Sequence, residues 1–104
     1  MLMRMKRDLK PVAFLAKCLA DENRLRILLS LNNGEKAVTE IVEELGLSQP
    51  LVSHHLRELR RSLLLKIERR GPFIFYEMTD PQILQILEAL DSLATRLLAN
   101  RTLF

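Results

Sequence analysis

A short run of polar and basic residues between Ser48 and Arg57 carries the side chains best suited to chemistry in this chain. Gln49, Ser53 and Arg57 recur every four residues, so a helix would place them along one side. Gln can bond bidentately to adenine, Arg to guanine, and Ser to base edges or phosphate. The residues of this segment that we predict to contact DNA are Ser48, Gln49, Pro50, Ser53, His54 and Arg57.

A second group of cations, Arg69 and Arg70, stands beside the turn-forming pair Gly71-Pro72. Arg at the tip of a hairpin can reach a phosphate or a narrow minor groove. Residues 53–70 hold six Lys/Arg against two Glu, the charge pattern expected of a phosphate-contacting surface. The residues that we predict to contact DNA here are Arg69, Arg70 and Gly71.

The polar side of the first segment needs an apolar side that docks it. Val52, Leu56 and Leu59 recur at the helical period and should be buried, in a helix from about Gln49 to Arg61. Ser48 precedes this helix as an N-cap candidate. With the apolar side docked, the polar side would be free to enter a DNA groove.

Two adjacent histidines in this helix, His54 and His55, are expected to differ in role. His54 lies on the polar side and can donate to a base or a phosphate. His55 lies one step round the helix, nearer the docked side. We expect His55 to pack or bond within the protein, with DNA reading as the alternative.

The neighbouring segments predict the rest of a winged helix-turn-helix. A short helix should span Ala37 to Leu45, and Gly46 can take the positive φ of a tight turn. Leu63 to Arg70 and Phe73 to Met78 are typical of two strands, since they hold good strand formers around Gly71-Pro72. Residues 37–61 are thus the predicted helix-turn-helix, and residues 63–78 the predicted wing.

Three more helices complete the pattern. One should cover residues 10–20, and a second should start at an Asp21 N-cap and end at Gly34, which suits a left-handed cap. A third, over residues 81–100, opens at Asp80-Pro81. The apolar stripe expected on the second helix is Leu25, Leu28 and Leu29.

These elements predict one mainly α domain over residues 1–104, a winged helix-turn-helix with a small β-hairpin in the order α-α-α-α-β-β-α. The single cysteine, Cys18, excludes an intramolecular disulfide and fits a reducing cytosol. The N-terminus lacks a signal-peptide run, and no stretch approaches the roughly 20 apolar residues of a membrane span. We therefore predict a soluble cytoplasmic protein without membrane contact.

The chain resembles the ArsR/SmtB family of bacterial and archaeal repressors in three segments. These are residues 19–28 (Leu-Ala-Asp-Glu-Asn-Arg-Leu-Arg-Ile-Leu), residues 45–59 (Leu-Gly-Leu-Ser-Gln-Pro-Leu-Val-Ser-His-His-Leu-Arg-Glu-Leu) and the wing. The resemblance covers residues 10–100 and implies a homodimer that binds an operator and releases it when an inducer binds.

The resemblance also implies that the first and last helices form the dimer interface. Independently, the last helix is apolar over a wide arc that a chain of 104 residues has little core to bury. The residues predicted at this interface are Val12, Leu15, Leu19, Leu87, Leu90, Leu93 and Leu97.

No sensor site is evident in the sequence. Metal-sensing relatives often carry Cys-Val-Cys where this chain has Ala37 and Thr39, so that thiolate site is absent. Cys18 should be a small core or interface residue, with a redox or thiophilic-metal sensor as the alternative. We predict no metal and no cofactor, and the inducer stays unidentified. Phosphate-loop, zinc-protease and nucleophile-elbow motifs are missing, which argues against an enzyme.

The sequence therefore predicts a dimeric, sequence-specific transcriptional repressor that binds an inverted repeat in double-stranded DNA. Two alternatives stay open. The apolar terminal helices could bind a partner protein, as in winged-helix interaction modules, or the domain could be an unspecific architectural DNA binder.

Overall fold

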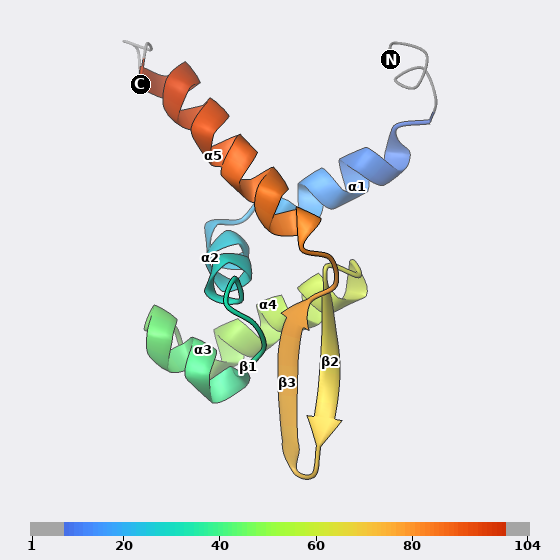
Figure 1. The fold of residues 1–104 in the computed structure, drawn as a ribbon, viewed down its shortest axis with the longest axis vertical. Coiled ribbons are helices and arrows are strands. Elements are labelled where there is room, and N and C mark those ends of the chain that lie inside the picture. The colour runs from blue at the N-terminus through green and yellow to red at the C-terminus, as the bar shows by residue number, and fades with distance from the viewer. Residues whose placement is uncertain (1–7, 100–104) are drawn as a thin grey trace.

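The structure is a computed structural model that describes residues 8–99. Its elements are α1 (Lys10–Leu19), α2 (Glu22–Ser30), β1 (Lys36–Ala37), α3 (Val38–Leu45), α4 (Gln49–Arg61), β2 (Leu65–Arg70), β3 (Phe73–Met78) and α5 (Gln82–Ala99). This mainly helical winged helix-turn-helix with a small antiparallel sheet confirms the predicted fold class. Helices α1 and α5 extend from one end of the molecule, and the β2–β3 hairpin extends from the other (Figure 1).

Two helices begin where side-chain caps were predicted. The Asp21 carboxylate accepts from the backbone N–H groups of Asn23 at 2.9 Å and Arg24 at 3.1 Å, at the start of α2. The Ser48 hydroxyl accepts from the backbone N–H of Leu51 at 3.3 Å, at the start of α4. Both caps are confirmed, because each satisfies N–H groups that have no partner within the helix.

The sheet has one strand more than predicted. β1 pairs antiparallel with β3, with Lys36 opposite Tyr76 and Ala37 opposite Phe75, so the strand order is β1-β3-β2. A strand of two residues has no periodicity to detect in a sequence. Its pairing attaches the hairpin to the segment that leads into α3.

The second strand begins at Leu65 rather than at the predicted Leu63. Leu63 has φ 66°, a left-handed conformation that is uncommon outside glycine. The N–H of Leu64 donates to the carbonyl of Leu59 at 3.0 Å, and that of Leu63 donates to Arg60 at 3.0 Å. This pair of bonds is a Schellman ending of α4. It ends the helix without the glycine that would have revealed the turn in the sequence.

The core lies between α2, α3, α4, the sheet and the start of α5. Its buried apolar residues are Ile27, Leu28, Leu31, Ile41, Val52, Leu56, Leu59, Leu64, Leu65, Ile83 and Leu87. The stripe predicted for α2 is partly wrong, because Leu29 is 45% exposed while Ile27 is fully buried. α2 packs against both α3 and α4, which turns the side with Ile27 and Leu28 inward.

The predicted cap of α2 is also wrong. The helix ends at Ser30 with Leu31 as its C-cap, and the N–H of Leu31 bonds to Leu28. Gly34 has φ 122° and lies in the turn that follows, so its positive φ serves the turn and not the helix end.

The two terminal helices are covered less than the rest. α1 contains no buried residue, whereas α5 buries Ile83 and Leu87. Within residues 8–99, no helix is both long enough and apolar enough to cross a membrane.

Candidate nucleic-acid interface

Helix α4 separates an accessible polar side from a buried apolar side. Val52, Leu56 and Leu59 are each fully buried, as predicted. The predicted contact residues on the other side are all accessible, and Ser53 alone is half-buried. The exposed members are Ser48, Gln49, Pro50, His54 and Arg57. The structure therefore brings these six residues together on one open side of α4.

The angle between α3 and α4 depends on a glycine and an arginine. Gly46 has φ 66°, and its N–H donates to the carbonyl of Val42 at 2.9 Å. Arg26, from α2, donates through Nη2 to the carbonyl of Leu45 at 2.9 Å. Gly46 was predicted from sequence, but Arg26 was missed because its partner lies 19 positions away. The cation also suits the negative end of the α3 dipole.

The two histidines of α4 occupy opposite environments. His54 is exposed on the polar side, while His55 is only 6% exposed. His55 Nδ1 accepts from Arg24 Nε at 3.3 Å, and His55 Nε2 lies 3.7 Å from an Asp21 oxygen. These contacts confirm that His55 bonds within the protein. Burial lowers the pKa of His55 below its ordinary value, the Asp21 carboxylate opposes that shift, and Arg24 adds to it.

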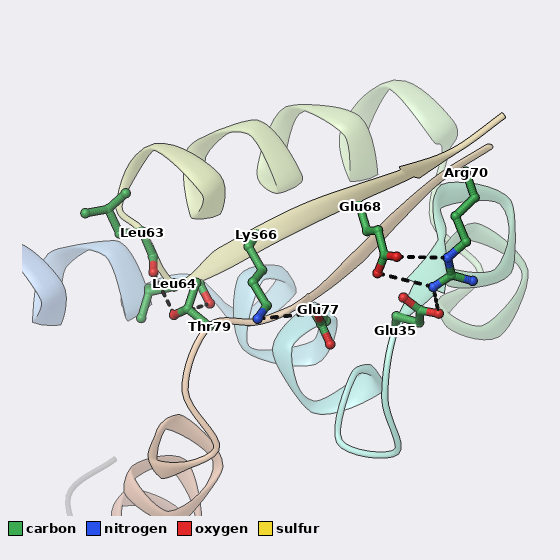
Figure 2. A network of polar contacts seen from close by, with 8 residues as sticks. All are labelled: Glu35, Leu63, Leu64, Lys66, Glu68, Arg70, Glu77 and Thr79. Carbon is green, nitrogen blue, oxygen red and sulfur yellow. Dashed lines mark hydrogen bonds and ion pairs between the residues drawn. The ribbon is translucent and has the colours of Figure 1, made fainter. Parts of the chain in front are cut away.

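Alternate residues of the wing face opposite sides. Leu65 is buried and Ile67 is half-buried, so Arg69 shares the side that faces the core at the hairpin base. Lys66, Glu68 and Arg70 lie on the other side, where Figure 2 shows ion pairs along the hairpin.

Arg70 is held by partners within the protein. Its guanidinium pairs with Glu35, next to β1, and with Glu68 at 3.3 Å (Figure 2). It also lies over the Phe75 ring, 4.3 Å from the centroid. The hydrogen bond that Arg70 donates to Glu35, and then the one that it donates to Glu68, raise the pKa of Arg70. Glu35 was missed from the sequence, since it lies 35 positions before Arg70.

The base of the hairpin is fastened as well. The Thr79 hydroxyl donates to the carbonyl of Leu63 at 2.8 Å, and Lys66 pairs with Glu77 at 3.5 Å (Figure 2). At the tip, Gly71 has φ 60° and is exposed. Arg69 is exposed too, and no partner for it is found among residues 8–99. Its charge is therefore available to a ligand, unlike that of Arg70.

The residues predicted at the dimer interface fall into two groups. Val12, Leu15, Leu90, Leu93 and Leu97 are exposed apolar side chains on α1 and α5. Leu87 is 6% exposed and belongs to the core of its own chain, and Leu19 packs against that core. The structure thus assigns Leu87 to the core, because the first turns of α5 pack against α2. Exposed apolar residues that were not predicted there are Phe14, Ile86 and Leu98.

An apolar groove runs between these two helices. It has a volume of about 640 Å³ and its lining includes Leu15 and Leu19 of α1 and Ile83, Ile86 and Leu90 of α5. A groove lined almost entirely by apolar side chains is uncommon on a monomeric protein surface and is typical of an interaction site.

No metal centre is seen in the described part of the chain. Within residues 8–99 no three His, Cys, Asp or Glu residues are grouped so as to hold a metal ion. Cys18 is half-buried and packs against the core. Its backbone carbonyl accepts from Arg24 Nη1 at 3.3 Å, so the end of α1 is linked to α2.

Comparison with known proteins agrees with this geometry. The profile of the arsR family of bacterial regulatory proteins matches residues 21–65. The chain is 40% identical over 81 residues to the arsenic resistance transcriptional regulator of Pseudomonas putida, which covers 77% of this chain. That match spans 61% of the relative, so this chain covers less than two thirds of its length.

Solved structures show the same fold over most of the chain. The transcriptional repressor BigR from Xylella fastidiosa has a TM-score of 0.80 at 31% identity, over 89% of this chain and 95% of that one. A homodimeric winged helix-turn-helix DNA-binding domain from Mycobacterium bovis has a TM-score of 0.74 at 29% identity, over 83% of this chain and 80% of that one.

The helix-turn-helix with its accessible polar side, the hairpin that follows it and these matches lead to one conclusion. The chain belongs to the ArsR family of DNA-binding transcriptional regulators, and it is not an enzyme.

Proposed function

We propose that this chain is a homodimeric, sequence-specific repressor that binds an inverted-repeat operator and leaves it in response to a signal. One observation carries the proposal, namely the accessible polar side of α4, with the partly buried Ser53 at its centre. The name of the Xylella relative as a repressor and the homodimeric Mycobacterium domain support the finer parts of it.

The proposed reading surface combines base contacts from α4 with phosphate contacts from the wing. Gln49 and Arg57 have the chemistry for adenine and guanine edges in the major groove. Ser48 caps the helix, where backbone N–H groups can hold a phosphate. The other members proposed to contact DNA are Pro50, Ser53, His54, Arg69 and Gly71.

Arg70 receives a different role in this proposal. Its guanidinium already pairs with Glu35 and Glu68, so a contact with DNA would require it to exchange those partners. We assign Arg70 to holding the tip of the wing against the segment before β1, and Arg69 to the phosphate contact.

The proposed dimer follows from the exposed apolar sides of α1 and α5. Pairing two copies across these helices would remove Val12, Leu93 and Leu97 from water, all of which are more than two fifths exposed. A two-fold dimer places its recognition helices in successive major grooves, about 34 Å apart. The operator should then be an inverted repeat with half-sites one helical turn apart.

The test is fluorescence anisotropy with the promoter of the operon that encodes this chain, compared with a random duplex at physiological salt. We expect the promoter to bind roughly a thousandfold more tightly. Equal affinity for both duplexes would make the chain an unspecific architectural binder. A monomer in light scattering without affinity for either duplex would instead make it a protein-interaction module.

A further inference from the structure

A partly buried polar cluster connects α4, the recognition helix of the proposed DNA complex, to the end of α1. Arg24, on α2, donates through Nε to His55 Nδ1 on α4 at 3.3 Å. Through Nη1 it donates to the carbonyl of Cys18, in the last turn of α1, also at 3.3 Å. The Arg24 guanidinium therefore connects α1, whose apolar side chains are exposed, to α4, whose polar side is proposed to contact DNA.

The groups around His55 determine which of its ring nitrogens carries the proton. Nδ1 accepts a hydrogen bond from a cation, so it carries no proton, and the neutral ring holds its proton on Nε2. Nε2 lies 3.7 Å from Asp21, an attraction without a close hydrogen bond. The charged and titratable groups that act on the ring are Asp21 and Arg24 from α2, and His54 and Glu58 from α4.

A second proton on His55 would disrupt this arrangement. The protonated Nδ1 could no longer accept from Arg24. The positive charge on His55, which is itself only 6% exposed, would then face the charge of the half-buried Arg24. Asp21, and to a smaller extent Glu58, offset this repulsion. Asp21 also caps α2 through two backbone hydrogen bonds. Protonation therefore has to release Arg24 from the recognition helix.

We infer that Arg24 is a positioning residue for DNA binding, which links α4 to α1 through neutral His55, and that protonation of His55 releases this link and weakens operator binding. The inference rests on the proposed function, because it needs an operator and a dimer in which α1 takes part. In such a dimer, the link fixes α4 relative to the subunit interface and hence relative to the α4 of the second copy. Releasing it would disturb the spacing of both recognition helices together.

The sign of the pH effect follows from the same contacts. Because the folded protein lowers the pKa of His55, the unfolded chain binds this proton more readily. The contribution of the cluster to stability is then present above the unfolded pKa of about 6.5 and is lost as the pH falls through the lower folded pKa. Operator affinity should decrease in the same direction.

The experiment measures operator affinity of the full chain by anisotropy between about pH 8 and about pH 5.5, the range in which histidines titrate. All variants carry His54→Asn, because the exposed His54 would otherwise add its own titration. His55→Asn in this background keeps an acceptor near the position of Nδ1 but cannot gain a proton. We expect the His54→Asn protein to lose affinity roughly tenfold per pH unit below its midpoint for each His55 of the dimer that gains a proton, and the double variant to lose much less.

Two arginines of α2 provide a matched pair. Arg24→Lys keeps the charge but cannot reach both partners, so it should weaken binding at about pH 8 and flatten the pH profile. Arg26 also donates to a helix-end carbonyl, that of Leu45, but does not touch His55. Arg26→Lys should therefore keep the steep pH profile of the parent.

A measurement without any substitution protects the test against misfolded variants. Long-range ¹H–¹⁵N spectra of the histidine rings should show His55 near neutral pH with its proton on Nε2. A proton on Nδ1, or identical pH profiles of the single and double histidine variants, would overturn the inference while leaving the repressor proposal intact. Failure of the wild type to prefer its promoter at about pH 8 would overturn both.

Discussion

Apolar side chains are buried in the body of this molecule but largely exposed on its two terminal helices. In the body, between α2 and β3, leucines and isoleucines of different elements bury one another. Seven of them are each at most 2% exposed, and so is Val52. On α1 and the outer part of α5, residues of the same type remain open, with Leu97 63% exposed. The difference indicates that the body folds around its own core, whereas the terminal helices require a further surface to cover them.

The largest effect should come from charging the open helices. Leu93→Glu with Leu97→Glu places two carboxylates on the exposed side of α5. If a second copy covers this side, each buried charge costs several kcal/mol, and the dimer dissociation constant should rise by roughly a thousandfold or more. Sedimentation or light scattering measures this, with Gln85→Glu, also exposed on α5, as a charge control. An unchanged oligomeric state would place the subunit contact elsewhere.

A smaller effect is expected from a matched pair of leucines in the body. Leu28 is fully buried, while its neighbour Leu29 is 45% exposed. Leu28→Ala should lower the free energy of unfolding by about 2–5 kcal/mol, because it leaves a cavity in the core. Leu29→Ala should change it by no more than about 0.5 kcal/mol. Urea denaturation at one protein concentration compares them, and equal losses would contradict the orientation of α2.

The reading surface of the body should show a base-specific effect. Gln49→Ala should cost about 1–3 kcal/mol in binding the operator and almost nothing on a random duplex. Arg61, at the other end of α4, is exposed and pairs with Glu58 at 3.4 Å. Arg61→Ala should therefore change the affinity for both duplexes by the same factor. Competition anisotropy measures both changes in affinity. Equal weakening on the two duplexes for Gln49→Ala would exclude a base contact.

The smallest effect should separate the two arginines of the wing. Arg69→Gln should reduce the slope of log affinity against log salt by about 0.9 for each phosphate that the side chain no longer neutralises. Arg70→Gln should retain the slope, because its charge is neutralised within the protein by Glu35 and Glu68. Salt titrations of operator binding provide both slopes. A slope reduced by Arg70→Gln alone would reverse the two roles.

Much of the helix-turn-helix could be predicted because its signals are local. Ser48 caps the very helix that it precedes, and Gly46 takes a positive φ within its own turn. Val52, Leu56 and Leu59 recur at the helical period, and all three are buried. The exposure of Gln49 and Arg57 follows from the same period, since one buried side leaves the opposite side open.

The features that sequence reasoning missed depend on partners far along the chain. β1 is two residues long and exists only because β3 pairs with it. A turn with φ 66° at Leu63, where no glycine stands, delays the start of β2. The burial of Leu87 depends on how the first turns of α5 meet α2, although its spacing matches that of the exposed Leu90 and Leu97.

The sequence by itself determined the five helices, the hairpin, the polar side of α4 and the family, because caps, glycine turns and helical periods act over a few neighbouring residues. Only the tertiary structure decided which charges are available. It pairs Arg70 with Glu35 and leaves Arg69 open, and it joins Arg24 to His55 across 31 positions. The physical reason is that a charge is satisfied by whatever the folded chain brings within a few ångströms, which the order of residues does not specify.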